Sequence, residues 1–279
     1  MKPAKKSISL LQVLTQFILN FYLSICILKT IQVSLQLYYP MGTKVKPYNT
    51  ESSKKQEVQQ MFDNIAHRYD FLNRFLSMGI DKGWRKKAVE ILQEHKPKRI
   101  LDIATGTGDF AIEALKLNPD EVVGVDISEG MLDVGRKKLK DRGISNVRLE
   151  FGDSEELQYE DASFDAVIVA FGVRNFENLE KGLSEIRRVL KPEGVAMILE
   201  LSKPKGIFGF FFNLYNKTLL PLWGKLFSGD NAAYSYLPES VRAFPEGDEF
   251  NGIMTKVKYN NVSDRRLSLG ICSIYTGTK

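Results

Sequence analysis

A glycine-rich turn follows the short apolar run at residues 100–104, and its residue types are suited to binding a small molecule. Gly106 and Gly108 in this turn lack a Cβ, so the backbone can approach a ligand closely. Asp102 lies inside the apolar run, four residues before Gly106. A carboxylate at this place repels a pyrophosphate but suits a ligand that carries positive charge.

Two cofactors are candidates for this turn. Gly106, Gly108 and Ala111 fit the pattern G-x-G-x-x-G/A, which binds dinucleotides. The alternative is S-adenosylmethionine, whose amino acid end carries an ammonium group and whose sulfur is a sulfonium. Asp102 could hold that ammonium, directly or through water, while the turn passes beneath the amino acid and the ribose.

Acidic residues also occur at the ends of the next two apolar runs. Asp126 ends the run 122–126, where a carboxylate accepts hydrogen bonds from ribose hydroxyls. Asp153 follows the run 147–151 and, with Ser154, could recognise the adenine amino group and ring edge. An ordinary helix-capping role is the alternative for each of them. Acids associated with three successive strands favour the methyl donor over a dinucleotide.

Composition excludes several other classes. The net charge is +5, but four lysines in residues 1–40 supply +4 of it, which leaves +1 on the rest. We therefore expect no nucleic-acid partner. The two cysteines, Cys26 and Cys272, lie far apart and join no Cys/His cluster. This pattern indicates no disulfide framework and no metal site, and it fits a reducing compartment.

Residues 1–40 are apolar and basic, unlike the rest of the chain. The uncharged stretch 8–28 follows three lysines and is long enough to span a membrane, although it contains several polar residues. A signal anchor would place the body outside the cell, away from an intracellular methyl donor. We therefore expect residues 1–40 to be an extension outside the fold, with Met41 as the true start. Residues 41–56 are expected to be a flexible lead.

Alternating helical and strand patterns follow. Two helices at 61–76 and 84–92 precede the repeated units. The expected strands are 100–104, 122–126, 147–151, 164–171 and 195–201, and the expected helices are 110–117, a helix between Ser128 and Gly143, and 179–190. Such units predict one α/β domain over residues 57–279, with a doubly wound, mostly parallel sheet that binds ligand at the carboxyl ends of its strands. The tail 255–276 is expected to form a closing hairpin.

An aromatic-rich insert at 206–245 interrupts the alternation. Lys217 and Pro221 break its apolar run, so a membrane-spanning helix is not expected. Its aromatic residues could cover the sheet, or form a lid or interfacial helix that admits an apolar substrate.

Six motifs together carry a resemblance to a known family. From about residue 55 to the end, the chain resembles the menaquinone/ubiquinone biosynthesis C-methyltransferases, and most nearly those that act on demethylmenaquinol. The motifs are Met61–Asp70 (MFDNIAHRYD), Leu101–Asp109 (LDIATGTGD), Phe171–Asn175 (FGVRN), Leu190–Gly194 (LKPEG), Leu199–Pro204 (LELSKP) and Tyr234–Ser240 (YSYLPES).

The resemblance implies a class I methyltransferase fold with an antiparallel C-terminal edge. It also carries contacts with S-adenosylmethionine over to Thr107, Asp126, Asp153 and Ser154. Two departures stand out, since Ala170 replaces a position that is sometimes serine in the family, and Lys256–Tyr259 replaces the usual end of the last helix.

The implied reaction moves a methyl group to a ring carbon of demethylmenaquinol, the last step of menaquinone biosynthesis, without a metal. A benzoquinol of the ubiquinone pathway and another small apolar acceptor are the alternatives. We expect Arg174 to stabilise the phenolate, because arginine stays protonated, and Asn175 to orient it. Asp109 could take the proton through a water, with His67 as second choice. Arg174 could instead form a structural ion pair with Glu177 or Glu200.

Three rival interpretations concern the chain as a whole. They are a nicotinamide-dependent oxidoreductase, a non-catalytic scaffold that binds the cofactor, and a methyltransferase outside quinone metabolism. A cytoplasmic protein is expected, with peripheral contact at the inner face of the membrane and a homo-oligomer both left open.

Overall fold

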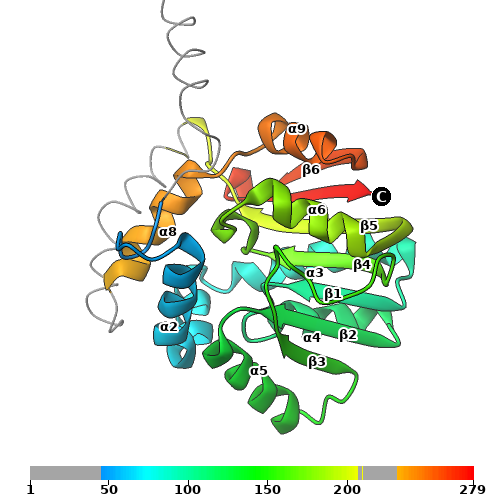
Figure 1. Ribbon diagram of the computed structural model, residues 1–279, viewed down its shortest axis with the longest axis horizontal. Helices are drawn as coiled ribbons and strands as arrows, with labels where there is room; N and C mark the ends of the chain where they lie inside the picture. The colour runs from blue at the N-terminus through cyan, green and yellow to red at the C-terminus, as the bar shows by residue number, and fades with distance from the viewer. Residues whose placement is uncertain (1–44, 207–208, 210–230) are drawn as a thin grey trace, which may run out of the picture. The chain divides into compact units, whose positions relative to one another are not determined.

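The computed structural model describes residues 45–206, 209 and 231–279 (Figure 1). The expected extension 1–40, the start at Met41 and most of the aromatic run in the insert lie outside the described residues. No helix in the described part of the chain is long and apolar enough to cross a membrane.

A seven-stranded sheet forms the centre of the fold, in the order β3-β2-β1-β4-β5-β7-β6. The neighbouring strands from β3 to β5 are parallel, and β7 runs antiparallel to both of its neighbours. The expected mostly parallel sheet with an antiparallel C-terminal edge is therefore confirmed. The strands are β1 (Arg99–Ile103), β2 (Glu121–Asp126), β3 (Val147–Phe151), β4 (Phe164–Ala170), β5 (Leu190–Leu201), β6 (Asn260–Leu267) and β7 (Cys272–Thr278).

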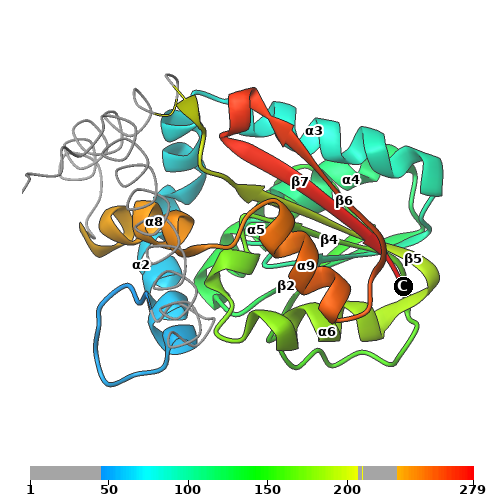
Figure 2. The same ribbon diagram turned by 90° about the horizontal axis from the view of Figure 1, so that it is seen from above.

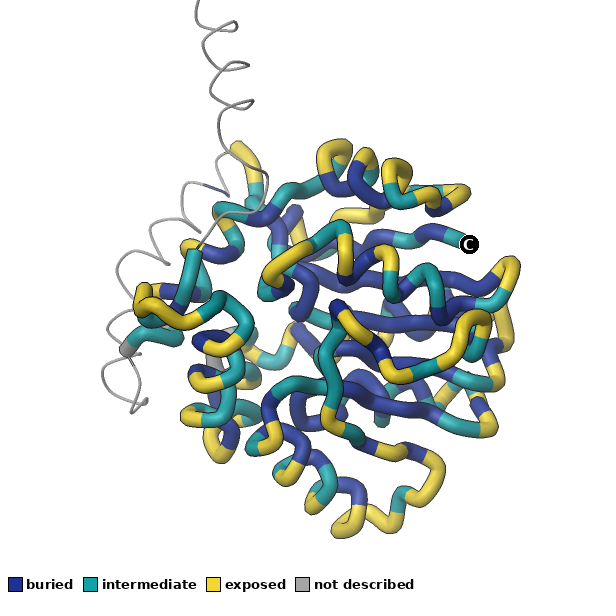
Figure 3. The backbone as a smooth tube through the Cα atoms, viewed as in Figure 1, coloured by how far each residue is buried: buried dark blue, intermediate teal, exposed yellow. Residues whose placement is uncertain are grey.

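Helices cover both faces of the sheet, which is why the central strands are mainly apolar. The helices α3 (Ile80–Leu92), α4 (Asp109–Ala114) and α5 (Glu129–Asp141) pack on one face. On the opposite face lie α6 (Leu179–Val189) and α9 (Asp248–Lys256) (Figure 2). Figure 3 shows the resulting continuous buried layer along the strands.

The strand order reverses between β1 and β4, because the chain leaves β1 toward β2 on one side and later returns to β4 on the other. Loops that follow these two strands therefore diverge and leave a crevice at their carboxyl ends. The helices α2 (Lys54–Leu76) and α8 (Asn231–Ala243) lie at this end of the sheet (Figures 1 and 2).

Local capping chemistry sets several helix boundaries. The Ser128 hydroxyl accepts a hydrogen bond from the Met131 amide and begins α5, as the sequence predicts. Asn178 caps α6 in the same way through the Lys181 amide.

Two differences from the expected elements lie in the second half of the chain. The sequence predicts a turn at residues 191–194, but β5 already begins at Leu190. Pairing with β4 shifts from Phe164↔Leu190 to Ala166↔Val195, so the turn residues form an irregularity inside the strand. The helices α8 and α9 were not predicted. The helix α9 ends at Lys256. Tyr259, beyond the end of this helix, is buried, and its hydroxyl donates to the Leu183 carbonyl.

The segment before α2 has a defined path around one buried carboxylate, and α2 begins inside the lead that we expected to be flexible. The amides of Tyr48, Asn49 and Thr50 donate to the Glu57 carboxylate at 2.7, 2.9 and 2.7 Å, and the Thr50 hydroxyl donates at 2.7 Å. Burial acts to raise the pKa of Glu57, but these four hydrogen bonds together hold it below its ordinary value.

Replacing Glu57 by alanine is expected to lower the free energy of unfolding by about 2–4 kcal/mol, because three backbone amides lose their acceptor. Since the folded pKa is lowered, the stabilisation is present at neutral pH and is lost as the pH falls through that pKa. Urea denaturation measures the change, and the exposed Glu94→Ala is the matched control. Equal stability of the two variants would contradict the assigned role.

Candidate active site

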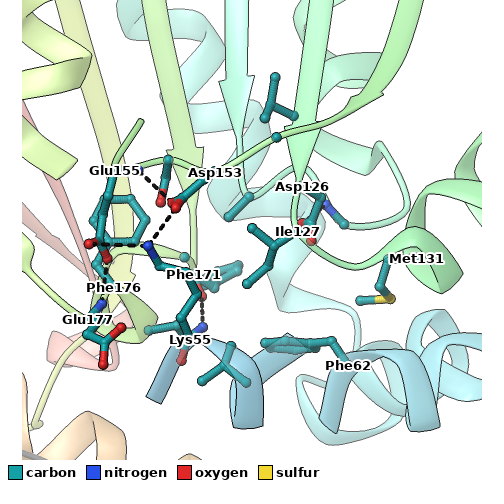
Figure 4. Close-up of a pocket in the computed structure, with 18 of the residues that line it drawn as sticks. Lys55, Phe62, Asp126, Ile127, Met131, Asp153, Glu155, Phe171, Phe176 and Glu177 are labelled. Atoms are coloured by element: carbon teal, nitrogen blue, oxygen red, sulfur yellow. Dashed lines mark hydrogen bonds and ion pairs between the residues drawn. The ribbon is translucent and has the colours of Figure 1, made fainter. Parts of the chain in front are cut away.

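Two neighbouring cavities lie at the carboxyl ends of the parallel strands. The first is narrow, about 60 Å³, and is lined by loops that follow β1 to β4. Figure 4 shows Asp126, Ile127 and Met131 on one side of it and Lys55, Asp153 and Glu155 on the other. The second cavity, about 580 Å³, is mainly apolar and is lined largely by α2, α3 and α8.

The glycine turn forms one wall of the first cavity. Gly106 has a φ of +55°, a left-handed conformation that glycine adopts readily. Its amide donates to Asp126 Oδ2 at 2.8 Å, and the Ser128 amide donates to Asp126 Oδ1 at 2.9 Å. Burial raises the pKa of Asp126 to about 6 despite these bonds. The turn thus holds a carboxylate at the cavity wall.

The loop after β4 lies very close to the residues that follow β1. A Cβ on Gly172 would lie 2.5 Å from the Ala104 Cβ, so only glycine lets the ends of β1 and β4 meet this closely. Ala104, Ala170 and Gly172 all line the first cavity. Ala170 offers no hydroxyl to this wall, as its departure from the family pattern implies.

Asp102 lies beneath the turn and outside both sets of lining residues. Its Oδ2 accepts hydrogen bonds from the Thr105 hydroxyl at 2.6 Å and the Ala111 amide at 3.0 Å. The side chain is buried, and Oδ1 has no partner. A direct contact with a ligand is not available from this place. Because Oδ1 has no partner in the protein, a water bound to it could connect Asp102 to a ligand, which is the water-mediated contact expected from the sequence.

Replacing Asp102 by asparagine is expected to flatten the pH dependence of stability. Burial raises the pKa of Asp102 to about 7, so the folded protein holds this proton more tightly than the unfolded chain. The associated stabilisation is present in acid and is lost as the pH rises through 7. The Asp102→Asn variant cannot ionise, so between about pH 5 and about pH 8 it should lose on the order of 1–3 kcal/mol less stability than wild type. Urea denaturation at both pH values tests this, with the exposed Asp120→Asn as control, and an unchanged slope would refute it.

Thr107, Gly108 and Asp109 are likewise outside both cavity walls. The Thr107 hydroxyl donates to Asp70 Oδ1 at 2.6 Å and accepts from Lys138 Nζ at 2.8 Å. Lys138 also lies 2.7 Å from both Asp109 Oδ1 and Asp70 Oδ2. This network fastens the glycine turn to α2 and α5, which the sequence did not predict.

The structure does not support Asp109 as the proton acceptor. Burial acts to raise its pKa, but Lys138 and Arg85 hold the pKa of Asp109 below its ordinary value. A carboxylate so stabilised, away from both cavities, is a poor base. His67 is exposed on α2 and lines neither cavity.

Arg174 reaches the larger cavity from the turn after β4, held by a buried ion pair. Its Nη1 lies 2.7 Å from Glu200 Oε1 and also donates to the Phe171 carbonyl. The Arg174 and Glu200 side chains are 7% and 0% exposed, and Arg174 Nε is buried without a partner. Of the two carboxylates that could pair with Arg174, the structure selects Glu200. The ion pair with Glu200 holds Arg174 in the wall of this cavity.

Asn175, the next residue, lines the first cavity instead. Its Oδ1 accepts a hydrogen bond of 3.0 Å from the Tyr236 hydroxyl of α8. Arg174 thus lines the second cavity and Asn175 lines the first. The hydrogen bond from Tyr236 connects α8 to the loop that carries both residues.

Three aromatic residues form a wall common to both cavities: Phe62, Tyr69 and Phe171. Burial raises the pKa of the Tyr69 phenol. Groups bound in the two cavities would meet at this wall. Tyr69 was not predicted as a site residue, although a hydroxyl within the apolar positions of the expected helix 61–76 is a signal for one.

Lys55 is a site residue for which the sequence offered no signal, because it lies in a polar segment. Its Nζ is 2.5 Å from Asp153 Oδ2 and 3.5 Å from Glu155 Oε2 (Figure 4). Burial acts to lower the pKa of Lys55, but the two carboxylates raise it overall. The first cavity is far smaller than the about 300–1,000 Å³ usual for ligand pockets. Lys55 and Asp153 both belong to the wall of this cavity.

The strand order, the glycine turn and the strand-end carboxylates together define the class I S-adenosylmethionine-dependent methyltransferase fold. Two solved structures show the same fold. A SAM-dependent methyltransferase of Thermotoga maritima has a TM-score of 0.57 at 20% identity, with 79% of this chain and 99% of that chain covered. Phosphoethanolamine N-methyltransferase 2 of Haemonchus contortus, in complex with S-adenosyl-L-methionine, has a TM-score of 0.54 at 17% identity, with 78% and 60% covered.

Sequence comparison is more specific, and the chain belongs to the ubiE/COQ5 methyltransferase family, whose pattern matches residues 50–279. The demethylmenaquinone methyltransferase of Bacteroides fragilis is 49% identical, with 86% of this chain and 99% of that protein covered. The protein of the same name in Deinococcus radiodurans is 47% identical, with 84% and 97% covered. The ubiquinone/menaquinone biosynthesis C-methyltransferase UbiE of Geobacter sulfurreducens is 43% identical, with 82% and 90% covered. The class and family expected from the sequence are confirmed.

Proposed function

We propose that this protein transfers the methyl group of S-adenosylmethionine to a ring carbon of demethylmenaquinol, the last step of menaquinone biosynthesis. The observation that carries the proposal is the pair of cavities with one shared wall. A narrow cavity with carboxylates adjoins a large apolar cavity that contains a buried guanidinium group. The relatives named for demethylmenaquinone methylation support the choice of acceptor.

The residues of the first cavity fit the methyl donor. Asp126 presents a carboxylate to the two hydroxyls of a ribose, and the partnerless Oδ1 of Asp102 can hold a water beneath an ammonium group. Ile127 and Met131 offer apolar contacts to an adenine ring. Asp153 and Ser154 lie where they could meet the polar edge of that ring. When bound, the donor supplies a methyl group already activated by its sulfonium.

The second cavity fits a prenylated quinol, since its wall is mainly apolar and Arg174 offers a cation inside it. A ring hydroxyl that has given its proton to solvent is stabilised as a phenolate by the neighbouring guanidinium and pushes electron density onto the adjacent ring carbon, which exchanges its own proton for the methyl group. Arg174 remains charged throughout and acts by stabilising the phenolate. Glu200 fixes its direction, and Asn175 holds the intervening loop. The shared aromatic wall aligns the reacting carbon with the donor and excludes water.

A cytoplasmic location at the inner face of the membrane follows from the two substrates. The methyl donor is made inside cells, whereas a prenyl tail resides in the bilayer. Flotation of the full chain with anionic vesicles that contain a prenylated quinone tests the membrane contact. Failure to float with such vesicles would contradict it.

Methyl transfer with the purified full chain tests the proposed function directly. The assay supplies methyl-labelled S-adenosylmethionine and either a short-chain demethylmenaquinol or a benzoquinol with the same tail. We expect label on the naphthoquinol ring carbon at the higher rate. Binding of the donor without transfer to either quinol would overturn the proposal, and preferential labelling of the benzoquinol would replace the acceptor.

A further inference from the structure

A second guanidinium group lines the acceptor cavity, and nothing in the mechanism above uses it. Arg85 lies on α3, in the second turn of the helix, and its side chain is 10% exposed. Its Nη2 donates to Asp81 and lies 3.6 Å from Asp109 Oδ2. Asp81 is itself held by the Ser77 hydroxyl at 2.7 Å. The carboxylates of Asp81 and Asp109 thus hold the Arg85 guanidinium group in place.

The remaining nitrogens of Arg85 are free to bind a ligand. Among the described residues, Nε and Nη1 have no hydrogen-bond partner, yet neither is among the fully enclosed polar atoms without one. Because Arg85 belongs to the cavity wall, these donors retain access to the cavity. Donors without a partner in a mainly apolar cavity wall favour a ligand that brings a hydrogen-bond acceptor to them.

The two guanidinium groups come from different elements, and both belong to the wall of the acceptor cavity. Arg174 follows β4, whereas Arg85 projects from α3. Both act electrostatically on the Tyr69 phenol, which lies in the wall shared with the first cavity. A ligand in this cavity therefore has guanidinium groups from two different elements in its wall.

We propose that Arg85 is a specificity-determining residue that donates hydrogen bonds to the second ring oxygen of the acceptor, while Arg174 binds the first. This inference rests on the proposed function, since a 1,4-quinol carries oxygens on opposite edges of its ring. Two cations in the cavity wall favour a ring that presents an oxygen to each of them. A phenol with one oxygen would leave Arg85 desolvated without a partner, which is costly.

The test compares two acceptors in the wild type and in the Arg85→Met variant of the full chain. One is a short-chain demethylmenaquinol, and the other is the same prenylated naphthalene ring without the hydroxyl remote from the reacting carbon. For wild type we expect kcat/KM to be about 10- to 100-fold higher for the quinol, as for one charge-assisted hydrogen bond. In Arg85→Met the quinol should fall to the level of the analogue, whose own rate stays nearly unchanged. Arg242→Met, an exposed arginine of the same cavity, should preserve the discrimination.

Each outcome bears on the proposal. An equal loss for both acceptors would mean that Arg85 only supports the fold or the glycine turn, and no loss would mean that it does not touch the acceptor; either overturns the inference and leaves the proposed function intact. Failure of wild type to methylate either acceptor would overturn both. Should Arg85→Met fail to fold, Arg85→Lys, which keeps the charge but loses the planar fork, is expected to retain part of the discrimination.

Discussion

Replacing Arg174 by methionine is expected to lower kcat by about 100- to 1,000-fold and to leave the affinity for the methyl donor within about threefold of wild type. The guanidinium acts on charge that develops on the acceptor oxygen, so its loss raises the barrier more than it weakens binding. Arg174 belongs to the wall of the acceptor cavity and not to that of the first cavity. Single-turnover methyl transfer and calorimetric titration with S-adenosylmethionine measure the two quantities separately.

The same substitution leaves the buried Glu200 carboxylate without its partner, so the effect on stability needs a control of its own. Glu200 is 0% exposed and loses its partner in Arg174→Met, at a cost of about 3–5 kcal/mol of stability. The double variant Arg174→Met/Glu200→Gln should recover most of that stability without recovering turnover. Arg187→Met on α6, outside both cavity walls, serves as the matched single substitution. Recovery of turnover in the double variant would show that Arg174 acts only through the fold.

Asp126→Asn is expected to weaken binding of S-adenosylmethionine by about 10- to 100-fold, with a smaller effect on the rate at saturation. Both oxygens of Asp126 accept backbone amides, from Gly106 and Ser128. An asparagine must turn its NH₂ group toward one of these amides, so it disturbs the turn and also loses the charge that favours the ribose hydroxyls. Equilibrium binding measures the effect, and Asp133→Asn on the exposed face of α5 is the control.

The affinity of wild type should also depend on pH through this residue. Burial raises the pKa of Asp126 to about 6, and the protonated carboxyl is a weaker acceptor for the ribose. Affinity should therefore be full above this pKa and decline as the pH falls through 6. The Asp126→Asn variant should lack this component, and an identical pH profile in both proteins would contradict the assignment.

Much of the sheet could be predicted because its signals are local. The apolar runs that became β1, β2 and β4 are largely buried, and Ser128 caps α5 through a bond three residues away. The residues 191–194 misled the prediction because a turn signal does not say whether the chain leaves the sheet. There the neighbouring strand continues the pairing on both sides of the irregularity.

Side-chain roles were harder to predict, because they depend on partners far away in the chain. Asp109 stands beside the glycines in sequence, yet its carboxylate pairs with Lys138 of α5 and Arg85 of α3 and belongs to neither cavity wall. Lys55 meets Asp153 only because α2 folds back across the ends of the strands.

The sequence by itself determined the class of fold and the nature of the donor site, since strand periodicity, the glycine turn and the strand-end carboxylates of Asp126 and Asp153 are short-range features. The tertiary structure alone decided which of the charged residues face a ligand. Arg174 became a cavity cation through Glu200, 26 residues away, and Arg85 joined the same cavity from a helix that precedes the whole sheet. Arg85 pairs with Asp81 on its own helix, but only the packing of that helix against the sheet places Arg85 in the cavity wall, and Arg174 depends on an ion pair between distant elements.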